Sequence, residues 1–370
     1  MKSRLPSLFL AVTLVGVPLT VAAQDATGFD RIWAQAELLG DRAAGDFPVL
    51  KLRGRYQGQY FTIDADDDGD ADGFETRRLR LGLDTYFSPA LRLGFDLNLN
   101  TDGKEPFVDD FDYLALDWKL GAATKLSLGK LRRKPLTRED STSSNAILTV
   151  ERSLAANSVA PGNIGGVYVA HERGDWSLGA GVLTGGLDDE LELPDGDGGM
   201  ALQINVGRPL NQHTEWRVDY LLNEGDADDD ALEPFRHVLS LNSESQWGPL
   251  NLQTDLILAD SLRSGSGDLV GVVLLPSLAV TSKLTGVLRY TYLSSSEDDG
   301  VRLGSRYERR PDTLGDERGK EYHAFYAGAN YLIYGNKLKF MVGLEHARLS
   351  RDVMPAYEAL TALGAFRIYF

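Results

Sequence analysis

The chain has no cysteine and only five histidines, four methionines and five tryptophans among its 370 residues. Without cysteine, a disulfide framework, a thiolate metal site and a cysteine nucleophile are all excluded. Positive charge is also scarce, because 38 basic residues face 54 acidic ones and the net charge is −16. Since the phosphate backbone of a nucleic acid would be repelled by so acidic a chain, we expect no nucleic-acid partner.

Long apolar runs are missing except near the start of the chain. An apolar run from Leu5 to Val21 follows two basic residues, and small residues at 21–23 have the form of a signal-peptidase site. We therefore predict a signal peptide over residues 1–23 and an exported protein; the alternative is a membrane anchor, which Pro6 and Pro18 disfavour. After this run no stretch approaches the ~20 apolar residues of a membrane-spanning helix.

The sequence is instead rich in segments that alternate between apolar and polar residues. In Leu91–Asn100 every second residue is leucine or phenylalanine, and arginine, aspartate, asparagine and one glycine stand between them. This period of two is typical of a strand with two different faces. Sixteen such segments begin near Val49, Glu75, Leu91, Phe111, Lys125, Gly165, Trp176, Met200, Glu215, Phe235, Leu250, Leu269, Lys283, Glu321, Lys337 and Tyr357. In the segment from Leu269, Pro276 is expected only at a strand end or a bulge.

The connections between these segments alternate in length. Turns such as Ser88–Ala90 are short, whereas loops such as Asp64–Phe74 and Leu131–Ile164 are long and polar. A β-sandwich has no reason to sort its loops in this way, whereas an outer-membrane barrel has short periplasmic turns and long outer loops. We predict an all-β protein: a transmembrane antiparallel β-barrel of sixteen strands over residues 49–370, in the outer membrane. An even strand number places both barrel ends in the periplasm, with residues 24–48 as a periplasmic segment and a short helix within Phe29–Leu39.

The last segment supports a closed barrel. Phe366, Ile368 and Phe370 share one face and Arg367 lies on the other. An apolar edge strand invites aggregation unless it pairs, so we expect it to pair with the strand at Val49–Ile63. Phe370 resembles the terminal aromatic that the barrel-assembly machinery reads, which makes that machinery an expected partner.

The acidic loop between the first two strands has the spacing of a calcium loop. Its twelve residues from Asp64 to Glu75 resemble an EF-hand loop, with a glycine at the sixth position. The calcium ligands would be Asp64, Asp66, Asp68, Asp70, Asp72 and Glu75. The alternative is a solvated acidic loop that shares divalent ions with lipopolysaccharide. No other cofactor is expected.

A basic cluster stands out in so acidic a chain. Around the third long loop it comprises Lys130, Arg132, Arg133, Lys134, Arg138 and Arg152, and the polar face of the first two strands adds Lys51, Arg53, Arg55, Arg78 and Arg80. Basic side chains that line a water-filled pore favour anions. The alternative is that they pair with Asp84, Asp96, Asp117 and Glu139 to form a neutral wall.

Part of this loop resembles a known family. Gly129–Leu136, Ser143-Ser144 and Glu151-Arg152-Ser153 resemble the signature of the phosphate-selective porin O/P family. The resemblance implies a homotrimer of sixteen-stranded porins in which the third outer loop, residues 131–164, folds inward and narrows the pore. It places Lys130–Lys134, Glu151 and Arg152 at the narrowing, and small anions such as phosphate among the solutes.

These observations lead to a functional hypothesis. We expect an outer-membrane porin for passive diffusion of small solutes, with a preference for anions. A general non-selective porin and an outer-membrane barrel enzyme are the alternatives. The enzyme is disfavoured because the five histidines are scattered and none pairs with a pore-side serine in the predicted arrangement.

Overall fold

The computed structural model describes residues 26–101, 106–132, 135–184, 200–224, 235–262 and 267–370. The predicted signal peptide, Arg133, Lys134 and parts of several outer loops lie outside these residues.

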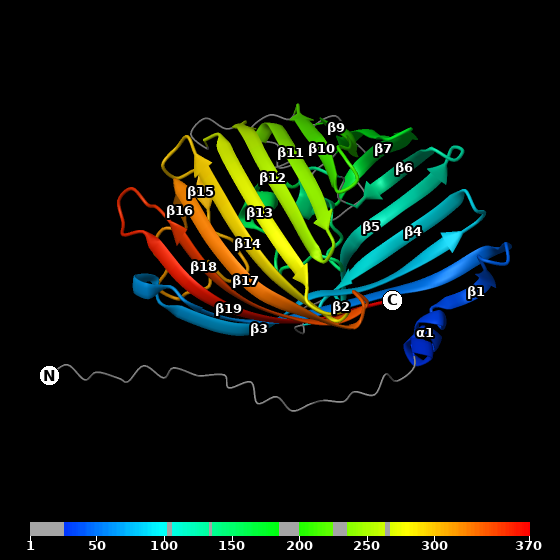
Figure 1. The fold of residues 1–370 in the computed structure, drawn as a ribbon, viewed down its shortest axis with the longest axis horizontal. Coiled ribbons are helices and arrows are strands. Elements are labelled where there is room, and N and C mark those ends of the chain that lie inside the picture. Colours follow the sequence, from blue (N-terminus) through cyan, green and yellow to red (C-terminus); the bar gives the residue numbers. More distant parts are fainter. Residues whose placement is uncertain (1–25, 102–105, 133–134, 185–199, 225–234, 263–266) are drawn as a thin grey trace. The chain divides into compact units, whose positions relative to one another are not determined.

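Sixteen long antiparallel strands form a closed barrel (Figure 1). Their bounds are β2 Asp46–Asp64, β3 Asp70–Tyr86, β4 Leu91–Leu99, β5 Val108–Lys119, β6 Thr124–Leu131, β7 Ile164–Arg173, β8 Trp176–Thr184, β9 Met200–Pro209, β10 Thr214–Asn223, β11 Phe235–Trp247, β12 Leu250–Ser261, β13 Leu269–Ala279, β14 Leu284–Ser295, β17 Glu321–Tyr334, β18 Leu338–Leu349 and β19 Tyr357–Tyr369. Each strand pairs with the next, and β19 pairs with β2 to close the ring. The predicted sixteen-stranded barrel is confirmed.

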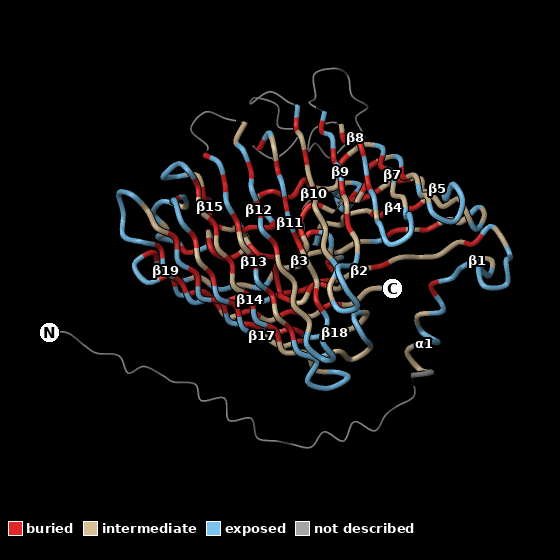
Figure 2. Tube along the Cα trace, turned by 45° about the horizontal axis from the view of Figure 1, so that its top comes forward, coloured by how far each residue is buried: buried red, intermediate tan, exposed pale blue. Residues whose placement is uncertain are grey.

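Burial follows the predicted alternation along each strand (Figure 2). On β18, Val342 and Leu344 are 57% and 54% exposed, whereas Lys339 and Glu345 are 1% and 2% exposed. Apolar side chains therefore cover the outer wall, where lipid satisfies them, and charged side chains point into the lumen.

The N-terminal segment differs from the prediction in one respect. Residues up to Gln35 form a separate unit, and its described part contains the helix α1 at Ala26–Ala34, which ends before the predicted Leu39. Glu37–Asp41 is instead a short strand, β1, that pairs with β2 at Asp46–Lys51. No helix in the described part of the chain is long and apolar enough to cross a membrane.

Pro276 lies inside β13 and not at a strand end or bulge, so that expectation was wrong. It pairs with Leu252 of β12 without a register shift. On the other side, the ladder to β14 joins Leu274 to Tyr290 and Ser277 to Val287 and skips the residues between. A barrel strand tolerates the proline because its missing N–H costs one ladder bond on one side only.

The seam between β19 and β2 is where the barrel closes. Ile368 lies opposite Tyr56, and Phe370 exchanges backbone hydrogen bonds with Gly54. On the N-terminal side of Gly54, β2 pairs with β1 in place of β19, and Leu52 N–H donates to the carbonyl of Ala36. The pairing predicted for the last strand is therefore present.

Among the described residues, two connections fold into the lumen. Residues 135–164 contain the short helices α2 (Arg138–Ser141) and α3 (Leu154–Val159), and residues 296–320 contain the paired two-residue strands β15 (Val301–Arg302) and β16 (Arg318–Gly319). Several apolar side chains of these connections are buried against the inner wall: Leu136, Val150, Val159, Val301 and Leu303. The lumen thus has its own apolar core, which holds the two connections in place.

Candidate functional site

The site is a basic pocket between the inner wall and residues 140–163. Its volume is about 420 Å³. The cationic lining consists of Arg55, Arg78, Arg80, Lys130, Arg132 and Arg152, and the acidic lining consists of Asp110, Asp112 and Asp140. We call this space the basic pocket. All of its basic lining residues belong to the basic cluster predicted from the sequence. The sequence pattern alone did not predict that these six side chains lie around one pocket.

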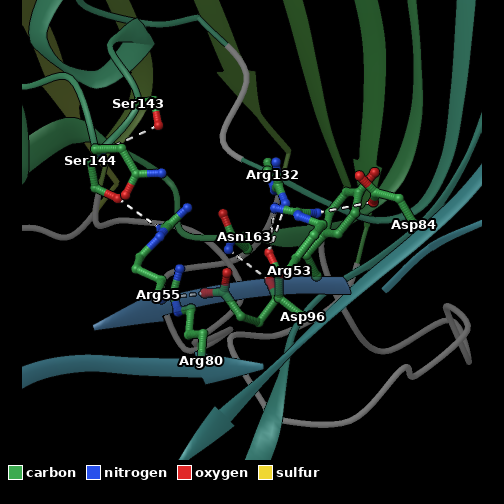
Figure 3. Close-up of polar contacts among 12 residues, drawn as sticks. Arg53, Arg55, Arg80, Asp84, Asp96, Arg132, Ser143, Ser144 and Asn163 are labelled. Carbon is green, nitrogen blue, oxygen red and sulfur yellow. Dashed lines mark hydrogen bonds and ion pairs between the residues drawn. The ribbon is translucent and has the colours of Figure 1, made fainter. Parts of the chain in front are cut away.

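One side of the basic pocket is charge-balanced (Figure 3). Asp96 accepts from Arg53 at 2.9 Å and from Arg132 at 2.7 Å, and Asp84 also accepts from Arg53. Arg80 pairs with Asp112 at 2.5 Å. The neutral wall considered as an alternative therefore exists along this stretch.

Arg55 and Arg78 are held differently. Arg55 donates to the hydroxyl of Ser144 at 2.8 Å, and Arg78 donates to the side-chain oxygen of Gln57 at 2.8 Å. No ion pair joins either guanidinium to a carboxylate of the described residues, and both line the basic pocket. Because no carboxylate is bound directly to either guanidinium, both can form hydrogen bonds with a passing anion.

Ser144 anchors the inward loop to the seam of the barrel. In addition to Arg55 at its hydroxyl, its carbonyl oxygen accepts from Gln57 at 3.2 Å and from Arg367 at 2.7 Å. Arg55 and Gln57 belong to β2, and Arg367 belongs to β19. The first and last strands therefore meet the same loop residue.

Arg77 enters the lumen because of a β-bulge. The β2–β3 ladder pairs Gln57 with Arg78 but Gly58 with Thr76, which leaves Arg77 as the extra residue. Its Nε lies 2.5 Å from Oε1 of Glu151. Strict alternation would have pointed Arg77 outward, so sequence reasoning missed it; the only signal was the Arg77-Arg78 pair itself.

The other predicted site residues lie elsewhere. Arg138 is in the lumen but pairs with Glu215 at 2.7 Å and with Glu244, outside the basic pocket. Lys51 is on β2 opposite Asp84 and does not line the basic pocket either. Arg133 and Lys134 fall outside the described residues.

Arg152 and Glu139 hold the inner end of the loop. Arg152 donates to the carbonyl oxygens of Glu139 and Thr142, at 2.9 and 2.6 Å. Glu139 pairs with Arg289 of β14 at 3.1 Å, and Arg289 pairs with Glu345 at 2.7 Å. The loop is thereby also fixed to the wall at β14, which β17 and β18 separate from the seam strand β19.

Residues 64–75, predicted as a calcium loop, form the turn of a hairpin. Asp64 and Asp70 pair as neighbours in a hairpin, with the 3₁₀ turn η1 at Asp66–Asp68 between them. Asp68 is buried and binds Arg351, with N–O distances of 3.1 and 2.6 Å. Tyr60 donates to Asp72 at 3.2 Å. In the described residues no three acidic, histidine or cysteine side chains come together as a metal site.

The five histidines do not form a catalytic arrangement. His171 contacts Thr124, His237 contacts Tyr220, His323 contacts Tyr290, His346 contacts Glu358, and His213 contacts Gln212 and the carbonyl of Gln246. These contacts join strands on the outer wall or lie in a turn.

A sixteen-stranded barrel with short and long connections in alternation and a loop folded into its lumen is the architecture of an outer-membrane porin, a channel. Within that class, residues 50–209 match the family model of the phosphate-selective porins O and P, which confirms the resemblance found in the sequence.

Solved structures share the fold at low identity. The trimer form of OmpT from Vibrio cholerae aligns with a TM-score of 0.57 at 12% identity, covering 88% of this chain and 100% of that one. An anion-selective porin from Comamonas acidovorans aligns with a TM-score of 0.57 at 14% identity, covering 87% and 99%. The channel DcaP of Acinetobacter baumannii aligns with a TM-score of 0.57 at 13% identity, covering 89% and 99%. A search of curated proteins gave no significant match.

Proposed function

We propose that this outer-membrane channel is a passive porin that prefers small anions, phosphate or similar ions among them. The observation that carries the proposal is the basic pocket, in which Arg55 and Arg78 offer guanidiniums bound only to neutral groups. Residues 131–164 constrict the path, and a permeating anion would exchange water for these guanidiniums and leave again. The anion-selective porin from Comamonas acidovorans, with the same fold, is consistent with this preference.

A general non-selective porin is the second candidate. It is favoured by the ion pairs of Arg53 with Asp84 and Asp96, which neutralise part of the same wall. The two candidates differ in whether Arg55 and Arg78 dominate the potential at the narrowing.

Partners follow from the proposed role. We propose a homotrimer, for which the trimeric form of OmpT gives a precedent within the fold. Outer-membrane lipid and lipopolysaccharide would surround the apolar outer wall, and the barrel-assembly machinery would read the strand that carries Phe370.

Planar-bilayer measurements in a potassium chloride gradient test the proposal. We expect a reversal potential on the anion-selective side, and we expect the double variant R55Q/R78Q to move it most of the way to zero. Arg348→Gln is the matched control, because Arg348 is exposed on the outer side of β18 and its loss should leave selectivity unchanged. A reversal potential near zero in the unmodified protein would favour the non-selective porin, and a cation-selective value would overturn the anion preference.

A further inference from the structure

A carboxylate of the inward loop lies among guanidiniums from two strands, β3 and β19. Glu151 is 6% exposed and pairs with Arg77 of β3 at 2.5 Å. Its neighbour Val150 accepts a hydrogen bond from Arg367 of β19 through its carbonyl oxygen. The positive charges of Arg78 and Arg367 also act on the same carboxylate.

This carboxylate stays ionised. Burial raises the pKa of Glu151, but the charges of Arg77 and Arg78 outweigh burial and hold the pKa well below its usual value. The local charge is therefore several guanidiniums with one fixed anion among them.

Glu151 also lines a second cavity in the lumen. The cavity has a volume of about 250 Å³, and we call it the outer pocket; its lining also includes Arg77, Arg152 and Arg306. Arg152 lines the basic pocket as well, so the two pockets adjoin at this residue. An anion that reaches this point meets the guanidiniums that Glu151 already occupies.

We propose that Glu151 acts as a tethered anion that fills the strongest anion-binding position of the pore and so prevents permeating anions from being trapped there. Conduction requires sites that attract an ion and release it, and uncompensated guanidiniums in a confined space would bind phosphate too firmly. Glu151 is thus a throughput-determining residue. The inference rests on the anion-preferring function proposed above.

A purely structural role for Glu151 makes a different prediction. If the Glu151–Arg77 pair only fixed the loop, its loss would widen or disorder the narrowing and would weaken binding of all solutes. A tethered anion predicts the opposite sign, because its removal creates a vacant site for a free anion.

The test compares Glu151→Gln with Glu215→Gln. Glu215 also lies in the lumen, where it pairs with Arg138 outside both pockets, and Arg138 keeps its second partner Glu244, so the control removes the same charge without exposing the Glu151 site. In planar bilayers we expect the phosphate concentration that halves the chloride current to fall about ten-fold or more in E151Q, and chloride conductance to saturate at lower salt. E215Q should stay within about two-fold of the unmodified protein. Unchanged or weaker phosphate block in E151Q, with or without a larger conductance, would overturn the proposal.

Assembly of E151Q is checked by the shift in gel mobility on heating. If the variant folds poorly, refolding in vitro carries the same test: phosphate at constant ionic strength should raise the yield of heat-modifiable barrel in E151Q but not in the unmodified chain. An absence of any anion-specific rescue would count against a tethered anion.

The two proposals can fail separately. A cation-selective or non-selective unmodified pore would defeat the proposed function. An anion-selective unmodified pore in which E151Q binds phosphate no more tightly would defeat only the role of Glu151.

Discussion

Glu308 is a buried acid at the point where residues 296–320 dock into the barrel. It accepts from the hydroxyl of Tyr322 at 2.6 Å and from Gly304 N–H at 2.7 Å. Burial, reinforced by the charge of Glu345, raises the pKa of Glu308 to about 7. Since the docked loop prefers the protonated acid, its stabilisation is complete at low pH and is lost as pH rises from the ordinary value of 4.5 through about 7.

The first prediction is that the loop is released more often at higher pH. Leu303 in this loop is 2% exposed, so a Leu303→Cys thiol reacts with a maleimide only when the loop detaches. The chain has no other cysteine to interfere. Relative to the same thiol in a Glu308→Gln background, labelling should rise roughly ten-fold between about pH 6 and about pH 7.5. A constant ratio between the two backgrounds would contradict the prediction, and thiol ionisation cancels in that ratio.

At the scale of elements, three outer connections are locked together at Asp68. Its carboxylate binds Arg351 and accepts from Gly315 N–H at 3.1 Å, and its carbonyl oxygen accepts from Thr313 at 2.7 Å. Asp68 is thus the centre of a latch between the β2–β3 turn, residues 296–320 and the β18–β19 connection.

The second prediction concerns this latch. Asp68→Asn leaves the Arg351 guanidinium buried without its carboxylate, which typically costs a few kcal/mol. We expect several-fold faster tryptic cleavage at Arg306 and Arg309, mapped by mass spectrometry, whereas Asp67→Asn, at an exposed neighbour, should leave the rate unchanged. Equal cleavage rates in the two variants would contradict the prediction that Asp68 holds these connections together. Protection of the unmodified protein by added calcium would show that a metal and not Arg351 organises the loop.

Local pattern and tertiary contact explain what the sequence could and could not predict. The strands were predictable because each has one face toward lipid and the other toward the lumen. The apolar and polar residues of β4 and β18 therefore alternate over about ten residues, which is enough to identify a strand. The bulge that turns Arg77 inward and the passage of β13 through Pro276 were not, because both depend on the register of a neighbouring strand. The fate of Asp68 was also hidden, since its partner Arg351 lies 283 residues away.

At the scale of the whole molecule, the barrel depends on a glycine at its closing seam. A side chain at Gly54 would place its Cβ 2.2 Å from the ring of Phe370, which lies over the bare backbone. The Phe370 ring covers the outer surface at the point where β19 ends and β1 begins to pair with β2. This contact therefore contributes to the closure of the whole barrel.

The third prediction is that Gly54→Ala weakens closure. The added methyl group must displace the Phe370 ring, and the end of β19 should fray as a result. We expect the temperature at which the folded band is lost on a gel to fall by several degrees. Gly364→Ala is the matched control on β19, because nothing lies within 4 Å of the Cβ it would add. An equal fall in both variants would indicate a general loss of strand quality and not a role for the seam.

The anchoring of Ser144 by Arg55, Gln57 and Arg367 has a consequence for the order of assembly. All three contacts can form only after β19 has paired with β2, because each strand supplies part of the binding site for Ser144. A barrel that has not closed therefore lacks the complete binding site for the loop that narrows the pore, whereas closure of the barrel fixes this loop in the lumen. The three side chains that join the loop to the barrel wall thus also position the narrowing, so the membrane receives a narrowed channel and not a transient wide one.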